Sequence, residues 1–249
     1  MDISPDIISG VDLDPLGEVQ RLGLVALSTD LTFERDAAKV VPQDRGALHV
    51  SRIAFANPTT PANLRAMAPR LSDAADLLVP GVELAAICFG CTSASVTIGD
   101  AVVDEAFGRV RPGVPVVTPA RAAVAAFGAL GMRRIALLTP YLVETTGPVQ
   151  AYFTAAGLDV VRTSCLDMAD DREIARISGR TIQDTAAQAD SPDAEAIFIS
   201  CTAMPALGLI ARIEDALGKP VVTSNQASLW QMLTLSGLDL PKGFGQLFG

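Results

Sequence analysis

Histidine is nearly absent: the 249 residues include one, His49. A Ser-His-Asp or Cys-His catalytic site would have to use it, and the surrounding HVSRIAF resembles no such site. Basic residues are also scarce, because 19 Lys and Arg stand against 28 Asp and Glu, a formal net charge of −9. This balance argues against nucleic acid as a partner, since a phosphate backbone needs a basic face.

Long apolar runs are missing as well. None approaches the ~20 residues that a membrane-spanning helix requires, so no membrane partner is expected. The acidic start, MDISPDIISGVDLDP, lacks the basic region and apolar core of a secretory signal. A cytoplasmic location is therefore expected, where thiols stay reduced. The four cysteines would be free thiols or ligands: Cys88, Cys91, Cys165 and Cys201.

A glycine-rich phosphate loop is also lacking, because Gly81, Gly90 and Gly99 do not have the spacing of a dinucleotide or P-loop motif. Hydrophobic residues are plentiful at 49%. They suffice for a large core without disulfides.

Two segments of the chain match each other. Residues 86–95 read AICFGCTSAS, and residues 196–204 read AIFISCTAM. Each is a short strand of the buried type that ends by presenting a cysteine, Cys91 or Cys201. The small residues that follow suit a tight turn into a helix. Two matching units that each deliver a thiol suggest chemistry between the thiols.

The rest of the chain extends this duplication. Short apolar segments alternate with helical ones, which predicts parallel sheets with crossover helices. Three pairs of matching residues are separated by 105 to 111 positions: Ser28 and Thr139, Cys91 and Cys201, and Thr118 and Thr223. Strands are predicted over 21–27, 47–55, 113–118, 134–138, 158–165 and 218–223, besides the two cysteine strands. Helices are predicted over 60–79, 96–108, 120–130, 150–156, 171–189 and 227–236, after an irregular leader over 1–20.

The predicted fold is therefore α/β, with two pseudo-symmetric lobes and an active site in the cleft between them. Each lobe has a roughly four-stranded parallel sheet flanked by helices. Residues 20–118 with 225–245 form the first lobe, and 119–224 form the second. Ligands bind at the carboxyl ends of such strands. Those ends carry Ser28–Asp30, Cys91–Ser93, Thr118, Thr139–Tyr141, Cys201–Thr202 and Thr223–Asn225.

Two opposed thiols suit proton transfer at a carbon. One removes a proton from one face and the other delivers a proton to the opposite face, or a thiolate adds to a conjugated double bond. Backbone N–H groups at a helix start stabilise a thiolate and hold a substrate carboxylate. The hydroxyls of Thr92, Ser93 and Thr202 add donors.

Other readings remain open at this level. Free cysteines are often small buried hydrophobes, which is the interpretation of Cys88 and Cys165. Cys88-Phe-Gly-Cys91 also has the spacing of a metal or redox motif, but zinc needs about four ligands and no histidine is at hand. Thr118 and Thr223 either cap helices or bind a ligand. Tyr141 follows a proline at a strand end, where a buried hydroxyl would need a partner.

The CTSAS and SCTA turns, the TPY turn and the repeated G-x-P-V-V-T segments resemble the aspartate/glutamate racemase superfamily. The chain is most similar to the branch with maleate cis–trans isomerase, arylmalonate decarboxylase and the ectoine-utilisation protein A group, and within it to that last group. The resemblance implies an enzyme without cofactor or metal. It implies that Cys91 adds to a double bond, that Cys201 transfers the proton, and that Tyr141 holds a carboxylate. Decarboxylases keep only the second cysteine, so Cys91 speaks against that activity.

Asp30 and Asp171 depart from maleate isomerases, which have asparagines that bind carboxylates at these places. A desolvated aspartate would repel a carboxylate. The alternative is that each aspartate only caps a helix. If both face the substrate, they favour one with a cationic nitrogen, as in the ectoine-utilisation group.

The predicted function is a racemase or isomerase acting on a small carboxylate derived from ectoine or hydroxyectoine, with Cys91 and Cys201 as catalytic residues. A homo-oligomer is expected. Its predicted substrate-binding residues are Asp30, Thr92, Ser93, Tyr141, Asp171 and Thr202. True maleate isomerisation is the first alternative, and a two-lobed ligand-binding protein without chemistry is the second.

Overall fold

Two four-stranded parallel sheets form the frame of the protein in the computed structural model, which describes residues 4–13 and 15–249. The first has the order β2-β1-β3-β4 and the second β6-β5-β7-β8, so the same topology occurs twice. The first sheet comprises β1 (Gln20–Leu27), β2 (Gly46–Ile53), β3 (Ala86–Gly90) and β4 (Val116–Val117). The second comprises β5 (Arg134–Tyr141), β6 (Asp159–Met168), β7 (Ala196–Ile199) and β8 (Val221–Thr223). The predicted two-sheet α/β fold is confirmed.

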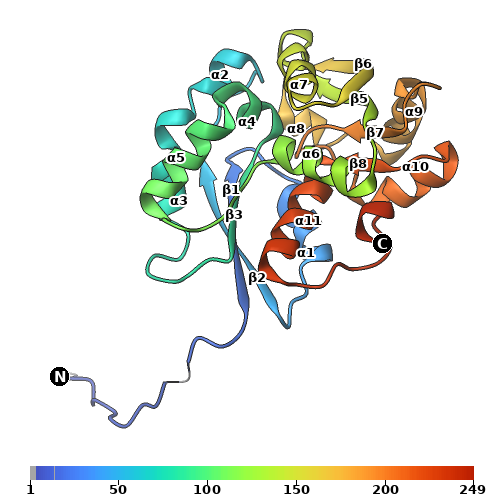
Figure 1. The fold of residues 1–249 in the computed structure, drawn as a ribbon. Coiled ribbons are helices and arrows are strands. Elements are labelled where there is room, and N and C mark those ends of the chain that lie inside the picture. The colour runs from blue at the N-terminus through green and yellow to red at the C-terminus, as the bar shows by residue number, and fades with distance from the viewer. Residues whose placement is uncertain (1–3, 14) are drawn as a thin grey trace.

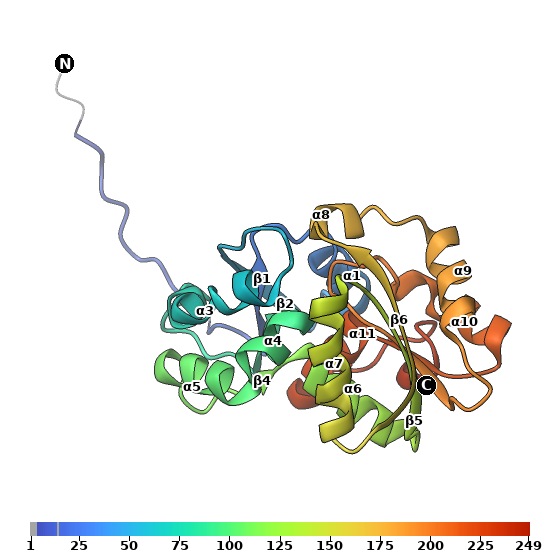
Figure 2. The same ribbon diagram turned by 90° about the horizontal axis from the view of Figure 1, so that it is seen from above.

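Helices cover both sheets (Figure 1). They are α1 (Phe33–Val40), α2 (Pro61–Arg65), α3 (Leu71–Asp76), α4 (Thr92–Ile98), α5 (Asp100–Val110), α6 (Pro119–Leu130), α7 (Val143–Ala155), α8 (Asp171–Ile174), α9 (Gly179–Ala189), α10 (Ile210–Leu217) and α11 (Ser224–Ser236). Short 3₁₀ turns lie at Ala68–Arg70, Leu207–Leu209 and Gln246–Phe248. The middle of the molecule is built where α6 packs on α11 and α4 packs on α6 and α7 (Figure 2).

Three of the predicted helices are divided in the structure. The segment 60–79 breaks at a 3₁₀ turn that contains Pro69, because proline lacks the N–H that a continuous helix needs. The predicted helix 96–108 is wrong at its start, because α4 begins at Thr92. It is also divided at Gly99, whose φ is +96° and which separates α4 from α5. The segment 171–189 separates into α8 and α9, and Ser178 caps α9 through the N–H of Thr181.

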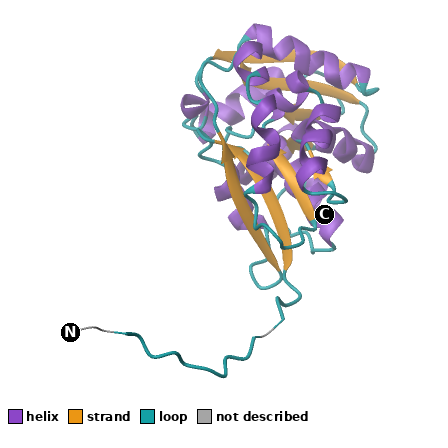
Figure 3. Cartoon of the chain, turned by 90° about the vertical axis from the view of Figure 1, so that its left-hand side faces the viewer, coloured by secondary structure: helices purple, strands orange, loops and turns teal. Residues whose placement is uncertain are grey.

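Helix α7 begins seven residues earlier than predicted, at Val143, with Pro148 inside it. Strand β5 likewise continues through the TPY segment, so Tyr141 is the last strand residue rather than a turn residue. The described part of the leader, residues 4–13 and 15–19, contains no helix or strand and projects from the body (Figure 3). Among described residues, no helix combines the length and apolarity needed to cross a bilayer.

The side chains of the first sheet pack into two hydrophobic clusters. Leu22 and Leu24 of β1 pack in one cluster, while Val25 and Leu27 pack in the other, as the period of two along a strand requires. The first cluster also includes Phe198 of the second sheet, so one continuous core joins the two sheets. The lobe boundaries, 20–118 with 225–245 and 119–224, stay a prediction.

Candidate active site

Cys91 lies between β3 and α4, at the N-cap position of the helix. Its backbone is extended, with φ −150° and ψ 115°, and its carbonyl accepts the first helical bond from the N–H of Ser95. The Ala94 N–H points at the thiol, and the Ser93 hydroxyl lies 3.7 Å from it. The helix start therefore supplies the donors that the sequence predicted for this cysteine.

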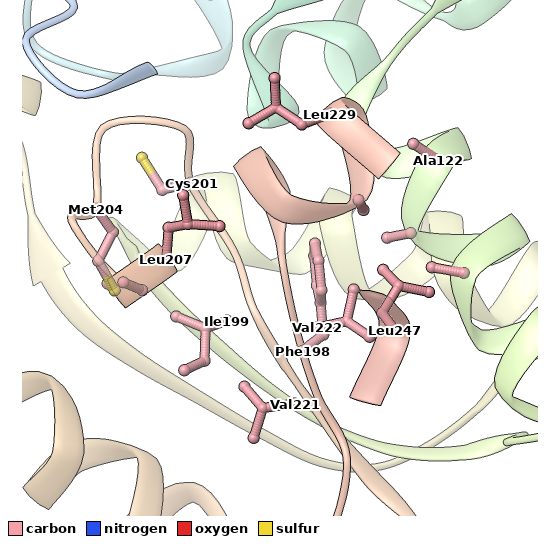
Figure 4. Close-up of a cluster of buried hydrophobic side chains, with 14 of the residues drawn as sticks. Ala122, Phe198, Ile199, Cys201, Met204, Leu207, Val221, Val222, Leu229 and Leu247 are labelled. Atoms are coloured by element: carbon pink, nitrogen blue, oxygen red, sulfur yellow. The ribbon is translucent and has the colours of Figure 1, made fainter. Parts of the chain in front are cut away.

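Cys201 follows β7 after one further residue, in a more strained backbone. The predicted turn into a helix is wrong here, because residues 202–204 form a turn and α10 begins only at Ile210, after a 3₁₀ turn. Its φ of +93° lies in the left-handed region, which a side chain other than glycine adopts at a cost. The Ala203 N–H points at this thiol. Figure 4 shows Cys201 in the loop above Ile199, beside Leu207 and at the margin of the buried cluster.

Both thiols line one small cavity between the sheets. Its volume is about 10 Å³, roughly the room that one water molecule needs. The lining residues are Leu27, Asp30, Thr59, Leu64, Cys91, Ser93, Tyr141, Asp171, Cys201, Thr202 and Ala203. The site is closed in this conformation, so a substrate must widen it.

The closure comes from the loop after β2. The Thr59 N–H donates to the Ala169 carbonyl over 2.8 Å, and the Thr145 hydroxyl donates to the Thr59 carbonyl over 2.7 Å. Asn57 donates to a carboxylate oxygen of Asp171 over 2.7 Å. These bonds tie the loop of the first half to the residue after β6, to α7 and to α8 of the second half.

Tyr141 stands beside both thiols at the end of β5. Its hydroxyl lies 3.1 Å from the Ser200 hydroxyl, and burial raises its pKa well above 10.0. The charges that Cys201 and Cys91 would carry raise this pKa further. Tyr141 is therefore a neutral hydrogen-bond donor at the cavity wall.

The two aspartates reach the cavity from opposite halves. One oxygen of Asp30 accepts from the backbone N–H groups of Thr32 and Phe33, at 3.0 and 2.9 Å. Asp30 therefore bonds the first N–H of α1 from two residues before its N-cap, Thr32, and also lines the cavity. Asp171 accepts from the Thr29 hydroxyl and from Asn57. The capping of α8 is done by Asp170 instead.

Burial controls the ionisation of the site. It raises the pKa of Cys91 to about 11, and the charges of Asp171 and Asp30 act in the same direction. It also raises the pKa of Cys201, and a charge on Cys91 adds to this. Both thiols are consequently protonated at neutral pH in the closed site, and one must lose its proton before it can act as a base or nucleophile.

Seven of the eight predicted site residues line the cavity: Asp30, Cys91, Ser93, Tyr141, Asp171, Cys201 and Thr202. Thr92 lies behind it and donates to the Ser224 hydroxyl over 2.8 Å. Thr118 and Thr223 are outside it. Thr118 donates to Asp100 over 2.6 Å, and Thr223 caps α11 through the N–H of Gln226.

Thr59 lines the cavity although no sequence pattern indicates it, because its place depends on the docking of a loop on the other half. Leu64 of α2, inside the predicted helix 60–79, also lines the cavity. Cys88 packs in the cluster opposite to that of Cys91, so these two cysteines do not act as a metal pair. Within the described ranges, no group of three or more His, Cys, Asp or Glu could hold a metal ion.

Comparison with known proteins identifies the family of the chain. Residues 59–248 match the family model described as arylmalonate decarboxylase. The chain belongs to the arylmalonate decarboxylase family. It is 29% identical to maleate isomerase from Nocardia farcinica over 235 residues, which are 90% of this chain and 92% of the relative. Arylmalonate decarboxylase from Bordetella bronchiseptica is 32% identical over 146 residues, covering 56% of this chain and 60% of the relative.

Solved structures agree with this assignment. Maleate isomerase Iso from Pseudomonas putida S16, a Cys→Ala variant with maleate, superposes with a TM-score of 0.83 at 25% identity, covering 92% of this chain and 97% of that one. Nocardia farcinica maleate cis–trans isomerase, a Cys→Ser variant with a covalently bound succinylcysteine intermediate, gives 0.84 at 25% identity, with 92% and 98% covered.

The predicted branch of the superfamily is thereby confirmed. The chain is an enzyme, and its predicted class, an isomerase, is that of the curated relatives that match along most of their length. The closer resemblance to the ectoine-utilisation group stays a prediction.

Replacing Asp30 by asparagine should stabilise the fold in a pH-dependent way. Burial raises the pKa of Asp30 from 3.8 to about 6, so the folded wild type binds a proton more tightly than the unfolded chain and loses stability as pH rises through this window. Asp30→Asn keeps the acceptor oxygen without the charge. Urea unfolding should show it about 2 to 3 kcal/mol more stable above pH 6, and less so toward pH 4. An equal difference at every pH would contradict this account.

Backbone strain at Cys201 can be measured by comparing two thiol-free variants. Glycine adopts a φ of +93° without strain and alanine does not. Cys201→Gly should therefore be more stable than Cys201→Ala by about 1 kcal/mol. Matched denaturant titrations test this, and an alanine variant as stable as the glycine variant would show that the position is unstrained.

Proposed function

We propose that the chain is a cofactor-independent isomerase in which Cys91 and Cys201 act as a pair on a carbon beside a substrate carboxylate. The observation that carries the proposal is that two thiols, from matching turns in the two halves, line one cavity with Tyr141. The relatives named maleate isomerase, one of them with a succinylcysteine intermediate, support the reaction class.

Two courses of reaction fit a thiol pair. In proton transfer, one thiolate takes the proton from the carbon next to the carboxylate, and the opposite thiol gives a proton to the other face. In the second course, an addition reaction, the Cys91 thiolate forms a C–S bond with one carbon of a conjugated double bond. The carbon next to the carboxylate takes the Cys201 proton. Rotation about the new single bond follows. Return of that proton to Cys201 then re-forms the double bond and expels the Cys91 thiolate.

Tyr141 and the start of α4 would hold the carboxylate. The neutral tyrosine hydroxyl can donate a hydrogen bond to the carboxylate, and Ser93 and Thr202 line the same cavity. The backbone N–H groups at the start of α4 add a favourable dipole. Developing negative charge beside the carboxylate would be stabilised by these fixed donors.

The substrate is proposed to carry a cationic nitrogen as well. Asp30 and Asp171 line the cavity, and their charges raise the pKa of Cys91. A bound cation would offset those charges and so favour the Cys91 thiolate. A small carboxylate derived from ectoine or hydroxyectoine has this chemistry. Maleate, a dianion, is the alternative that the named relatives favour.

Serine substitution tests the thiol pair. Cys91→Ser and Cys201→Ser should each lower kcat by about 100- to 10,000-fold, because serine is a far weaker base and nucleophile. Cys165→Ser is the control, since Cys165 is half-buried in β6 and does not line the cavity. Full activity in both test variants would refute the proposed function.

A substrate panel in D₂O tests the charge argument. Maleate, aspartate, hydantoins and ectoine derivatives are incubated with the wild type and followed by NMR for isomerisation and for deuterium beside the carboxylate. We expect the enzyme to turn over the panel members that carry a cationic nitrogen and not maleate. Asp30→Asn should lower that turnover. Fumarate formation alone would favour the maleate isomerase. Tight binding without exchange would leave a ligand-binding protein.

A further inference from the structure

Ser224 joins the two cysteine turns through a single oxygen. It is the first residue of α11 and is fully buried. Its hydroxyl oxygen accepts from the Cys201 N–H over 3.0 Å and from the Thr92 hydroxyl over 2.8 Å. Thr92 directly follows Cys91 in the chain. The oxygen therefore contacts the backbone of one cysteine and the neighbour of the other.

A second bond crosses between the same turns. The Thr202 hydroxyl donates to the Gly90 carbonyl over 3.0 Å. Gly90 directly precedes Cys91, and Thr202 directly follows Cys201. Each cysteine turn is thus held by the threonine of the other, directly on one side and through Ser224 on the other.

The Cys201 turn needs such support because its backbone is strained at φ +93°. Beyond Cys201, Asn225 donates to the Thr202 carbonyl over 2.9 Å, and Thr32 donates to the Ala203 carbonyl over 2.7 Å. Ser224 is the partner of the strained residue's own N–H. Losing it would leave a buried donor unpaired and free the thiol to turn away.

We propose that Ser224 is a positioning residue, whose hydroxyl fixes the Cys201 thiol relative to Cys91 without touching the substrate. Ser224 is not among the residues that line the cavity. The inference rests on the proposed function insofar as the two thiols act as a pair. A misplacement of about 1 Å between reacting groups costs about 100-fold in rate, so the bond bears on turnover and not only on folding.

Ser228 provides a matched control in the same helix. It is also fully buried, and its hydroxyl donates to the Ser224 carbonyl over 2.8 Å. It contacts neither Cys91 nor Cys201 and bonds the thiol of Cys88 instead. Ser228→Ala therefore removes a buried hydroxyl from α11 and leaves the bonds of Ser224 to Cys201 and Thr92 in place.

The test compares Ser224→Ala with Ser228→Ala in two assays. The first measures kcat and KM on the substrate that the wild type turns over. The second measures alkylation of each cysteine by iodoacetamide from about pH 7 to pH 10, without substrate, by peptide mass spectrometry. Ser224→Ala should lower kcat about 100-fold at unchanged KM. In this variant iodoacetamide should alkylate Cys201 about tenfold faster than in the wild type, through local opening. Ser228→Ala should do neither.

Equal behaviour of the two variants in both assays would overturn the proposal. Should Ser224→Ala fail to fold, Ser224→Cys keeps the size with a weaker acceptor, and a wild-type kcat and Cys201 reactivity there would overturn it equally. The alkylation assay needs no substrate. If the wild type turns over no substrate but Ser224→Ala still speeds alkylation of Cys201, the positioning of Cys201 by Ser224 is supported and the proposed function is refuted.

Discussion

The site depends on the hydrogen bonds that link the end of β3 to the end of β7, from Thr202 to Gly90 and through Ser224. The hydrophobic cluster that spans both sheets brings the two halves together, but apolar contact is not directional. Hydrogen bonds are directional, and they determine how the two thiols face each other. An internal duplication becomes one site because the copies are bonded at their cysteine turns.

Closure and ionisation are linked in this cavity. Little room is left for water, so burial raises the pKa of Cys91 and of Asp30. The resting enzyme accordingly keeps its thiols protonated, which protects them from indiscriminate reaction. Under the proposed function, a cationic ligand would favour the Cys91 thiolate, so that Asp30 and Asp171 would connect substrate selection with thiol activation.

The duplicated pattern predicted the two sheets and placed Cys91, Cys201 and Tyr141 at strand ends, because parallel strands deliver their carboxyl ends to a common edge. Thr59 could not be predicted in this way, since it reaches the cavity through a loop bonded to Ala169, more than 100 residues away. Ser224 was recognisable only as a strand-end residue. Its partners come from both cysteine turns, which local sequence does not encode.

The most direct test of the two-thiol site is a crystal structure of the Cys201→Ser variant with the substrate that the wild type turns over. The reacting carbon is predicted to lie against the Cys91 sulfur, with the carboxylate on Tyr141. A substrate bound elsewhere, for example in the groove lined by Leu166, Arg176 and Ile177, with Cys91 untouched, would contradict the account.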